Sequence, residues 1–438
     1  MSEYVEFTKE MKKDYTILAP NMLPIHFKLI LQVFKNRGYK MELLTTSGRE
    51  IVETGLKYVH NDTCYPAILV IGQFIHALQS GKYDPHKTAL LISQTGGGCR
   101  ASNYISLLRK ALKNAGLEFV PVISFSIGGL ESHSGFKISL PVWHRMFYAV
   151  IYGDLLMTLV NQVKPYEITK GTAESLADKY AKEIANTMDS DGVSFAKVKR
   201  TCRAIVKDFE SIPQIKTQKV PVGIVGEIYV KFSPLGNNNL ESFLVSEGAE
   251  VTVPGLLDFC LYCVINNIAD KKLYGRNKYI APFAKLAYDF VVSREKQISE
   301  ILSESGRFRA PAPIARTAER IRDYINIGVK MGEGWLLPAE MLELYDSGIK
   351  NIVCTQPFGC LPNHICGKGM MKPLKAKNPG MNIVAIDYDA GASVVNQENR
   401  LKLMLANARE QMAAESEEKQ RVSEKEKAEK SEKQAAKA

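Results

Sequence analysis

Several features that define common classes of protein are missing from this sequence of 438 residues. The N-terminus, MSEYVEFTKEMKKDY, is charged and has no hydrophobic signal region. The longest apolar stretch, 146–160, is interrupted by Gly153 and Asp154, so it does not predict a membrane span. These absences favour a cytoplasmic protein without a membrane partner.

Motifs for binding nucleotides and nucleic acids are also missing. No glycine-rich phosphate loop ending in Lys-Ser or Lys-Thr occurs, so any ATP hydrolysis needs a separate partner. The absence of helix-turn-helix, zinc-finger and RNA-sheet motifs makes nucleic acid an unfavoured partner. The basic excess lies in residues 1–408, with 49 basic and 39 acidic residues, because residues 409–438 carry eight of each. A basic body suits phosphate-bearing or acidic partners such as coenzyme A, a nucleotide or an acidic protein.

The composition that remains is that of a globular protein, 45% hydrophobic and 24% charged, and the length suits two or three domains. Short apolar runs alternate with segments of helical periodicity, which predicts an α/β fold with parallel sheets in two Rossmann-like lobes. We place the lobes at 1–135 and 216–404, with a helical linking segment at 136–215 and a helical insertion at about 256–345. The charged segment 405–438 is expected to be a disordered tail or a solvated helix.

The predicted strands are 15–19, 41–45, 88–93, 118–124, 221–226, 249–253, 350–354 and one that begins at 382. Helical periodicity or helix signals predict helices at 22–37, 67–78, 102–115, 240–247 and 370–377. Segments 227–239 and 355–369 are interpreted as loops, because both are rich in Gly, Pro and Asn.

Three of the eight cysteines share one local setting, since Cys64, Cys99 and Cys360 each precede a predicted helix. Free N–H groups and the positive end of a helix dipole favour a thiolate or an iron–sulfur cluster there. Ligands of parallel sheets collect at the carboxyl ends of strands, where the Cys99 and Cys360 loops fall. Three thiolates can hold a four-iron cluster and leave the fourth iron open. No compact Cys-x₂-Cys-x₂-Cys run exists, so three ordinary loop thiols remain an alternative.

The other cysteines have simpler interpretations. Cys260 and Cys263 form a CxxC pair inside a helical apolar pattern, which favours buried small hydrophobic residues over a redox pair. Cys354 ends a predicted strand and is expected in the core. Cys366 is either a further cluster ligand or a core or loop thiol, and Cys202 suggests no role.

Longer motifs surround the three cysteines: HNDTCYP at Cys64, TGGGCRASNY at Cys99 and QPFGCLPNHICGKGM at 356–370, the last followed by NIVAIDYDAGAS. With GEIYVKFSPLGNNNL at 226–240, they resemble motifs of the 2-hydroxyacyl-CoA dehydratase superfamily, over most of residues 15–404. Within it the chain resembles the activase-related branch, often the carboxyl-terminal part of large activases, and is similar to double-cubane cluster proteins. Gly98-Cys99-Arg100 stands where relatives often have Pro-Cys-Arg, a change that loosens the loop and keeps the thiol.

The resemblance implies an oxygen-sensitive iron–sulfur protein in which Cys64, Cys99 and Cys360 hold a 4Fe-4S cluster, with a double-cubane cluster as the alternative. It implies single electrons supplied by a separate ATP-hydrolysing iron–sulfur activator. The chemistry implied is radical dehydration of a 2-hydroxyacyl-CoA, or reduction of another small substrate. The alternative is a non-catalytic electron-transfer or scaffold subunit of a larger assembly. We expect a dimer with itself or with a paralogous subunit.

Further residues are candidates for the same site. Glycines 96–98, among them Gly97 and Gly98, and Gly359 would let backbone N–H groups approach the cluster sulfurs. Arg100 faces the cluster, an acyl-CoA phosphate or a salt-bridge partner. His364 is a candidate acid/base or hydrogen-bond donor, with capping or packing as the alternative. Glu227 and the asparagines 237–239 line the same cleft or form only a turn.

Overall fold

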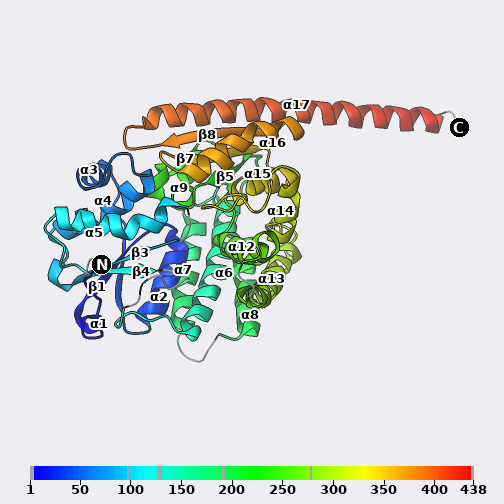
Figure 1. Ribbon diagram of the computed structural model, residues 1–438. Coiled ribbons are helices and arrows are strands. Elements are labelled where there is room, and N and C mark those ends of the chain that lie inside the picture. The colour runs from blue at the N-terminus through cyan, green and yellow to red at the C-terminus, as the bar shows by residue number, and fades with distance from the viewer. Residues whose placement is uncertain are drawn as a thin grey trace.

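The computed structural model describes residues 4–95, 98–125, 131, 133–188, 193–276 and 279–435. It confirms the predicted α/β class, with two four-stranded, all-parallel sheets surrounded by helices (Figure 1). The first sheet consists of β1 (Thr16–Pro20), β2 (Lys40–Leu44), β3 (Thr88–Ser93) and β4 (Val122–Phe125). The second consists of β5 (Val220–Gly226), β6 (Ala249–Thr252), β7 (Asn351–Pro357) and β8 (Asn382–Tyr388).

The α-helices of the first half are α1 (Met11–Asp14), α2 (Pro24–Lys35), α3 (Arg49–Tyr58), α4 (Tyr65–Gln79), α5 (Tyr104–Asn114), α6 (Leu140–Val163), α7 (Thr172–Thr187) and α8 (Phe195–Glu210). Those of the second half are α9 (Ile228–Phe232), α10 (Pro234–Asn237), α11 (Leu240–Ser246), α12 (Leu256–Tyr274), α13 (Ile280–Glu304), α14 (Ile314–Arg320), α15 (Leu336–Asp346), α16 (Met371–Lys377) and α17 (Val394–Ala435). Short turns of other helical types are η1 (Pro85–Lys87), η2 (Arg100–Asn103), η3 (Ile321–Asp323), η4 (Asn363–Gly367) and η5 (Lys368–Met370).

Both sheets have the same topology. Their strand orders are β2-β1-β3-β4 and β6-β5-β7-β8, so each sheet extends first to one side of its starting strand and then to the other. The connections therefore diverge between β1 and β3, and again between β5 and β7. In open parallel sheets a crevice forms outside the carboxyl ends of the strands at such a point. This fold thus has two candidate crevices, one in each half.

The central strands are buried, as expected of parallel sheets covered on both faces. All residues of β3 except its last are buried, and β7 is buried along its whole length. β7 continues to Pro357, beyond the predicted end at 354, because Thr355 and Gln356 pair with Ile386 and Asp387 of β8. The extension carries the strand directly to the Cys360 loop.

Two segments interpreted as loops contain helices, and those interpretations were wrong. Segment 227–239 folds into α9 and α10, which begin at side-chain caps: Glu227 accepts the N–H of Val230, and Ser233 accepts that of Gly236. In segment 355–369 the chain forms the π-helical turn η4 and then η5. These helices are too short to show apolar periodicity, so composition alone suggested loops.

Helix α6 joins the two halves. Of the described helices it is the one with the length and composition to cross a membrane, but 72% of its most apolar window is buried inside this fold. A Cβ at Gly153 would lie 2.3 Å from His26 on α2, so glycine allows that close packing. The carboxylate of Asp154 accepts hydrogen bonds from the N–H groups of Leu256 and Leu257, which begin α12. The residues that interrupt the apolar stretch therefore connect α6 to both halves.

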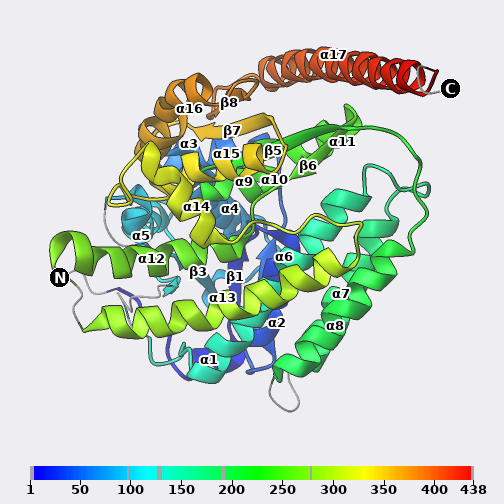
Figure 2. The ribbon, with the colours of Figure 1, turned by 90° about the vertical axis from the view of Figure 1, so that its right-hand side faces the viewer.

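Helices α12 and α13 form an outer layer beside α6 (Figure 2). The last helix, α17, begins against the second sheet, where Leu401, Met404, Leu405 and Ala408 are buried. It then extends away from the body of the protein (Figure 1). The charged tail is therefore helical as far as residue 435, and its described side chains after Ala408 are mostly exposed.

Candidate functional site

Loops from the two halves meet at the carboxyl ends of the sheets. The N–H of Tyr65, the first residue of α4, donates to the carbonyl of Phe358, which follows β7, at 3.0 Å. Gly359 has φ +73°, and a Cβ there would lie 3.0 Å from the Cα of Cys64. Cys360 is the next residue. The fold therefore brings the helix start at Cys64 against the loop that carries Cys360.

Cys99 belongs to the same neighbourhood. It precedes η2, a turn of 3₁₀ helix that leads into α5, so the helix predicted at 102–115 begins with a different geometry. The pKa of Cys99 is raised to about 11, mainly by burial and in smaller part by the charges of Glu333, Glu227 and Cys64. Burial also raises the pKa of Cys360, followed by the charges of Glu227, Glu333 and Cys99. The fold thus places the three predicted thiols within electrostatic range of one another and of two carboxylates.

Backbone N–H groups at the helix starts oppose these shifts. Ala67 lowers the pKa of Cys64, Ala101 that of Cys99, and Asn363 that of Cys360, although burial raises it more in each case. Neither Cys64 nor Cys99 makes a full capping hydrogen bond. The thiols therefore face the first N–H groups of helices, as the sequence predicted. The sulfurs of Cys64 and Cys99 do not act as helix caps.

Tyr104 was missed by sequence reasoning. Its hydroxyl lies 2.8 Å from the sulfur of Cys64. Burial raises the pKa of Tyr104 well above its ordinary value, so the phenol keeps its proton and can donate to a Cys64 thiolate. The residue ends the motif TGGGCRASNY, whose length pointed to the loop but not to this contact.

Two buried carboxylates lie beside the thiols. Glu227 accepts the N–H of Val230, and Glu333 accepts that of Ile228, both at 2.9 Å. Burial raises the pKa of Glu227 to about 8, with Glu333 as the second cause, and burial also raises the pKa of Glu333. The pair therefore retains a proton at neutral pH. Glu333 was not predicted; its one signal is its place between Gly332 and Gly334, both with positive φ.

A buried ion pair adjoins these carboxylates. The amine of Lys231 lies 3.0 Å from a carboxylate oxygen of Glu340, and both side chains are almost completely buried. Lys231 lowers the pKa of Glu227, Glu333 and Glu340, against the larger effect of burial. The positive charge closest in sequence to Glu227 is therefore already paired with another acid.

The remaining predicted residues have different positions. Arg100 is exposed and donates to the carbonyl of Asp62 at 2.5 Å, which ties the Cys99 loop to the one before Cys64. Its positive charge lowers the pKa of Cys64. Gly98 donates its N–H to the sulfur of Met331 at 3.2 Å. Gly97 and Gly96 lie outside the described residues.

His364 is exposed, and its backbone N–H donates to the carbonyl of Cys360. The neighbouring Asn363 is buried and donates from its side chain to the carbonyl of Thr355 at 2.8 Å. Of the asparagines 237–239, Asn237 is buried and donates to the carbonyl of Val230 at 2.9 Å. An acid/base or hydrogen-bond role for His364 stays a prediction, as does the place of the asparagines in the cleft.

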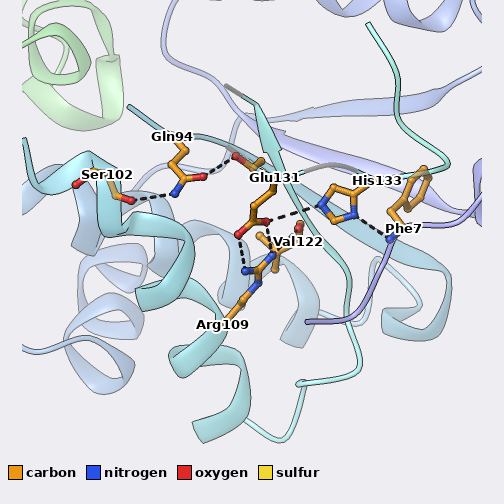
Figure 3. Close-up of polar contacts among 8 residues, drawn as sticks. Phe7, Gln94, Ser102, Arg109, Val122, Glu131 and His133 are labelled. Atoms are coloured by element: carbon orange, nitrogen blue, oxygen red, sulfur yellow. Dashed lines mark hydrogen bonds and ion pairs between the residues drawn. The ribbon is translucent and has the colours of Figure 1, made fainter. Parts of the chain in front are cut away.

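Polar contacts behind the Cys99 loop fix its position (Figure 3). Gln94 accepts from the hydroxyl of Ser124 at 2.7 Å and donates to the carbonyl of Ser102 at 3.0 Å. Farther along, Arg109 on α5 makes two hydrogen bonds to Glu131, at 2.9 and 2.7 Å. Next to Glu131, His133 accepts the N–H of Phe7 at 3.1 Å, as Figure 3 shows. The start of α5 is therefore held to β3 and β4, and its middle to the segment after β4.

The other cysteines are divided between core and site. Cys202 and Cys354 are fully buried, which confirms the core prediction for Cys354. Cys260 and Cys263 lie on α12, as predicted, but are only half-buried. Burial raises the pKa of Cys263 and of Cys366, and Glu333 raises each further. Cys366 therefore lies within electrostatic range of the site, with both of its predicted roles open.

The arrangement of the three thiols differs from the ligand set of a single metal ion. Within the described residues, no three His, Cys, Asp or Glu side chains converge as the ligands of one metal ion do. In a four-iron cluster each thiolate binds a different iron, so the sulfurs stand farther apart than the ligands of one ion. Three thiols from three separate loops could each bind one iron of such a cluster. The cationic iron would also compensate for the raised thiol pKa values, because metal binding deprotonates a thiol.

Comparison with known proteins adds no assignment: no protein-family model matches the sequence, and no curated protein matches it.

Proposed function

We propose that this chain is an iron–sulfur protein of the 2-hydroxyacyl-CoA dehydratase and activase-related type, with a 4Fe-4S cluster held by Cys64, Cys99 and Cys360. The observation that carries the proposal is the contact between Gly359 and Cys64, which joins cysteine loops almost 300 positions apart. The quoted motifs and the mutual electrostatic effects of the three thiols support the same assignment.

When bound, the cluster would supply low-potential single electrons and an open iron that acts as a Lewis acid. The protein's own residues would tune it. Tyr104 donates toward the sulfur of Cys64, and hydrogen bonds to cluster sulfurs raise the reduction potential by stabilising negative charge. Glu227 and Glu333 hold a proton beside the thiols, which limits the negative charge at the site.

The partners follow from the same reasoning. Electrons would come from a separate ATP-hydrolysing iron–sulfur activator, and the basic body suits an acyl-CoA substrate. A chain that only transfers electrons or supports a larger assembly would keep the cluster and lack turnover. An assay for dehydration of 2-hydroxyacyl-CoA thioesters with the activator present separates these two functions.

The first experiment measures iron and acid-labile sulfide per chain, with visible and EPR spectra, on protein purified without oxygen. We expect about four irons per chain, and about eight would indicate a double-cubane cluster. Cys99→Ala and Cys360→Ala should lose most of the iron. Cys202→Ala is the matched control, because that buried thiol lies on α8 and should not affect the iron content. Failure of the wild type to hold iron after anaerobic reconstitution would overturn the proposal.

A further inference from the structure

A second polar site lies away from the cysteines, at the carboxyl end of β6. A cavity of about 120 Å³ is lined there by α6, α12, α13 and α15 and by the segment 252–255 at the end of β6. Figure 2 shows α12 and α13 in front of α6 in this part of the molecule. Most of the wall is apolar, including Leu155, Val253, Leu257, Ile298, Leu302 and Leu344.

Four carboxylates line this cavity, and one of them is almost completely buried without a partner. Asp258, on the first turn of α12, is 7% exposed. Among the described residues, its carboxylate makes no hydrogen bond or ion pair. An isolated buried carboxylate is costly, so an unpartnered one facing a cavity points to a missing positive group or proton. Burial raises the pKa of Asp258 well above its ordinary value, followed by the charges of Glu343 and Glu295.

Two further carboxylates that line the cavity have an oxygen without a hydrogen bond among the described residues. One oxygen of Glu295, on α13, is buried without a hydrogen-bond partner. Glu343, on α15, uses one oxygen to accept the N–H of Ala312 at 3.1 Å. Burial raises the pKa of Glu295 to about 7 and that of Glu343 to about 8. Three acids from three helices therefore face one small space.

The other charged groups at the cavity are already paired. Asp154 accepts from His26 and from two N–H groups of α12. Arg309 forms an ion pair with Glu250, which lies on β6. No described group of three His, Cys, Asp or Glu side chains has the arrangement of ligands for a single metal ion. A positive group that compensates these acids would therefore be neither a described side chain of the cavity nor a single metal ion held by three of them.

We propose that the cavity binds a small aliphatic ammonium ion. An ammonium group has three N–H donors, which matches the three acids Asp258, Glu295 and Glu343. An alkyl chain of about four carbons would fill the apolar part, since an apolar cavity of about 150 Å³ accommodates benzene. This site does not depend on the proposed cluster, because its lining residues include none of the three cysteines.

The test is isothermal titration calorimetry of the full chain with n-butylammonium chloride, and with n-butanol as an uncharged molecule of similar shape. At a pH of about 8.5 the ligand is charged and Glu295 is ionised. We expect saturable binding of butylammonium that is about tenfold tighter than that of butanol. The titratable and charged groups facing the cavity from its several elements are Asp154, Asp258, Glu295, Glu343 and Arg309, with Glu340 nearby.

Variants identify the site. Asp258→Asn should weaken butylammonium binding about tenfold or more and leave butanol binding unchanged. The variant should fold, because the side chain of Asp258 makes no hydrogen bond or ion pair among the described residues that the amide would lose. Glu295→Gln provides a second test, and Glu300→Gln, exposed on the same helix, is the matched control that should bind like wild type. Equal affinity for butanol and butylammonium, unchanged binding by Asp258→Asn, or no binding of butylammonium would each overturn the proposal.

Discussion

The two sheets have the same strand order but different polar groups at corresponding positions. The residue after the first strand of the first sheet is Asn21, an uncharged amide, whereas Glu227 follows the corresponding strand of the second sheet. The third strand of each sheet leads to a cysteine, Cys99 in one and Cys360 in the other. The shared topology thus supplies two crevices, both halves supply thiols, and the second half alone supplies a buried carboxylate after its first strand.

The second half also buries a pair of opposite charges, whereas the pair compared with it in the first half is not buried. Lys231 and Glu340 form a buried ion pair, whereas the pair of Lys28 and Asp178 beside the first sheet is about half exposed. Breaking a buried pair leaves an uncompensated charge in a medium of low dielectric constant. The comparison teaches that identical topology does not give equal sensitivity to substitution, and the following predictions test it from the largest expected effect to the smallest.

The largest effect is expected for Lys231→Met, which should lower the free energy of unfolding by about 3–5 kcal/mol at a pH near 8. The reason is that Glu340 stays buried without its partner. Urea denaturation measures the change. The matched variant Lys28→Met should cost less than about 1 kcal/mol, because its pair is exposed. The double variant Lys231→Met/Glu340→Leu should recover most of the loss, and equal losses in the two single variants would contradict the comparison.

Next in size is the pH dependence that Glu227 confers. Because its pKa is raised, from an ordinary value of 4.5 to about 8, the folded protein binds more protons than the unfolded chain between these values. The contribution of Glu227 to the free energy of unfolding is therefore fully present below a pH of about 4.5. It is lost progressively as the pH rises toward about 8. We expect Glu227→Gln to reduce this fall by an amount on the order of a few kcal/mol.

The measurement is the free energy of unfolding in urea at several pH values between about 5 and 8. Asn21→Asp supplies the reciprocal test, since it gives the first half the acid that it lacks. It should steepen the loss of stability with pH, because the amide oxygen of Asn21 is buried without a hydrogen-bond partner among the described residues. An unchanged pH profile in both variants would show that these positions are not comparable.

A smaller effect is expected where the two halves touch. Gly359→Ala should destabilise the protein by about 1–3 kcal/mol, because its φ is +73° and the new Cβ would lie 3.0 Å from Cys64. Gly38→Ala is the matched control, with φ +80° and open space around the new atom. Both variants introduce the same strain at positive φ, so the difference between their denaturation midpoints reports the steric effect of the new Cβ against Cys64. Equal midpoints would mean that the loops can move apart without lowering the free energy of unfolding.

The smallest effect concerns the hydrogen bond between Tyr104 and Cys64. Tyr104→Phe should cost about 0.5–1.5 kcal/mol of stability in protein without a cluster. It should also raise the pKa of Cys64, because the phenol is among the groups that lower it. The rate of Cys64 alkylation against pH reports that shift. Tyr15→Phe is the control, since its hydroxyl makes no hydrogen bond among the described residues.

Much of the architecture was determined by the sequence itself. Apolar runs such as TALLIS located the strands, because a strand in a covered parallel sheet must be apolar on both faces. Cys64, Cys99 and Cys360 could be selected as candidates because a cysteine before a helix has a local signature. The short helices α9 and α10 were not found, since their signals are single caps at Glu227 and Ser233 rather than a periodic pattern.

The tertiary structure alone decided which side chains surround the thiols and the cavity. Glu333 reaches the N–H of Ile228 across 105 positions of sequence, and Tyr104 reaches Cys64 across 40. Asp258 carries no motif, and its exceptional feature is burial without a partner, which only packing creates. Local sequence determines backbone preference and apolar pattern over a few residues. The position of a polar group relative to distant ones depends on how the sheets and α6 pack, because that packing sets both distance and dielectric environment.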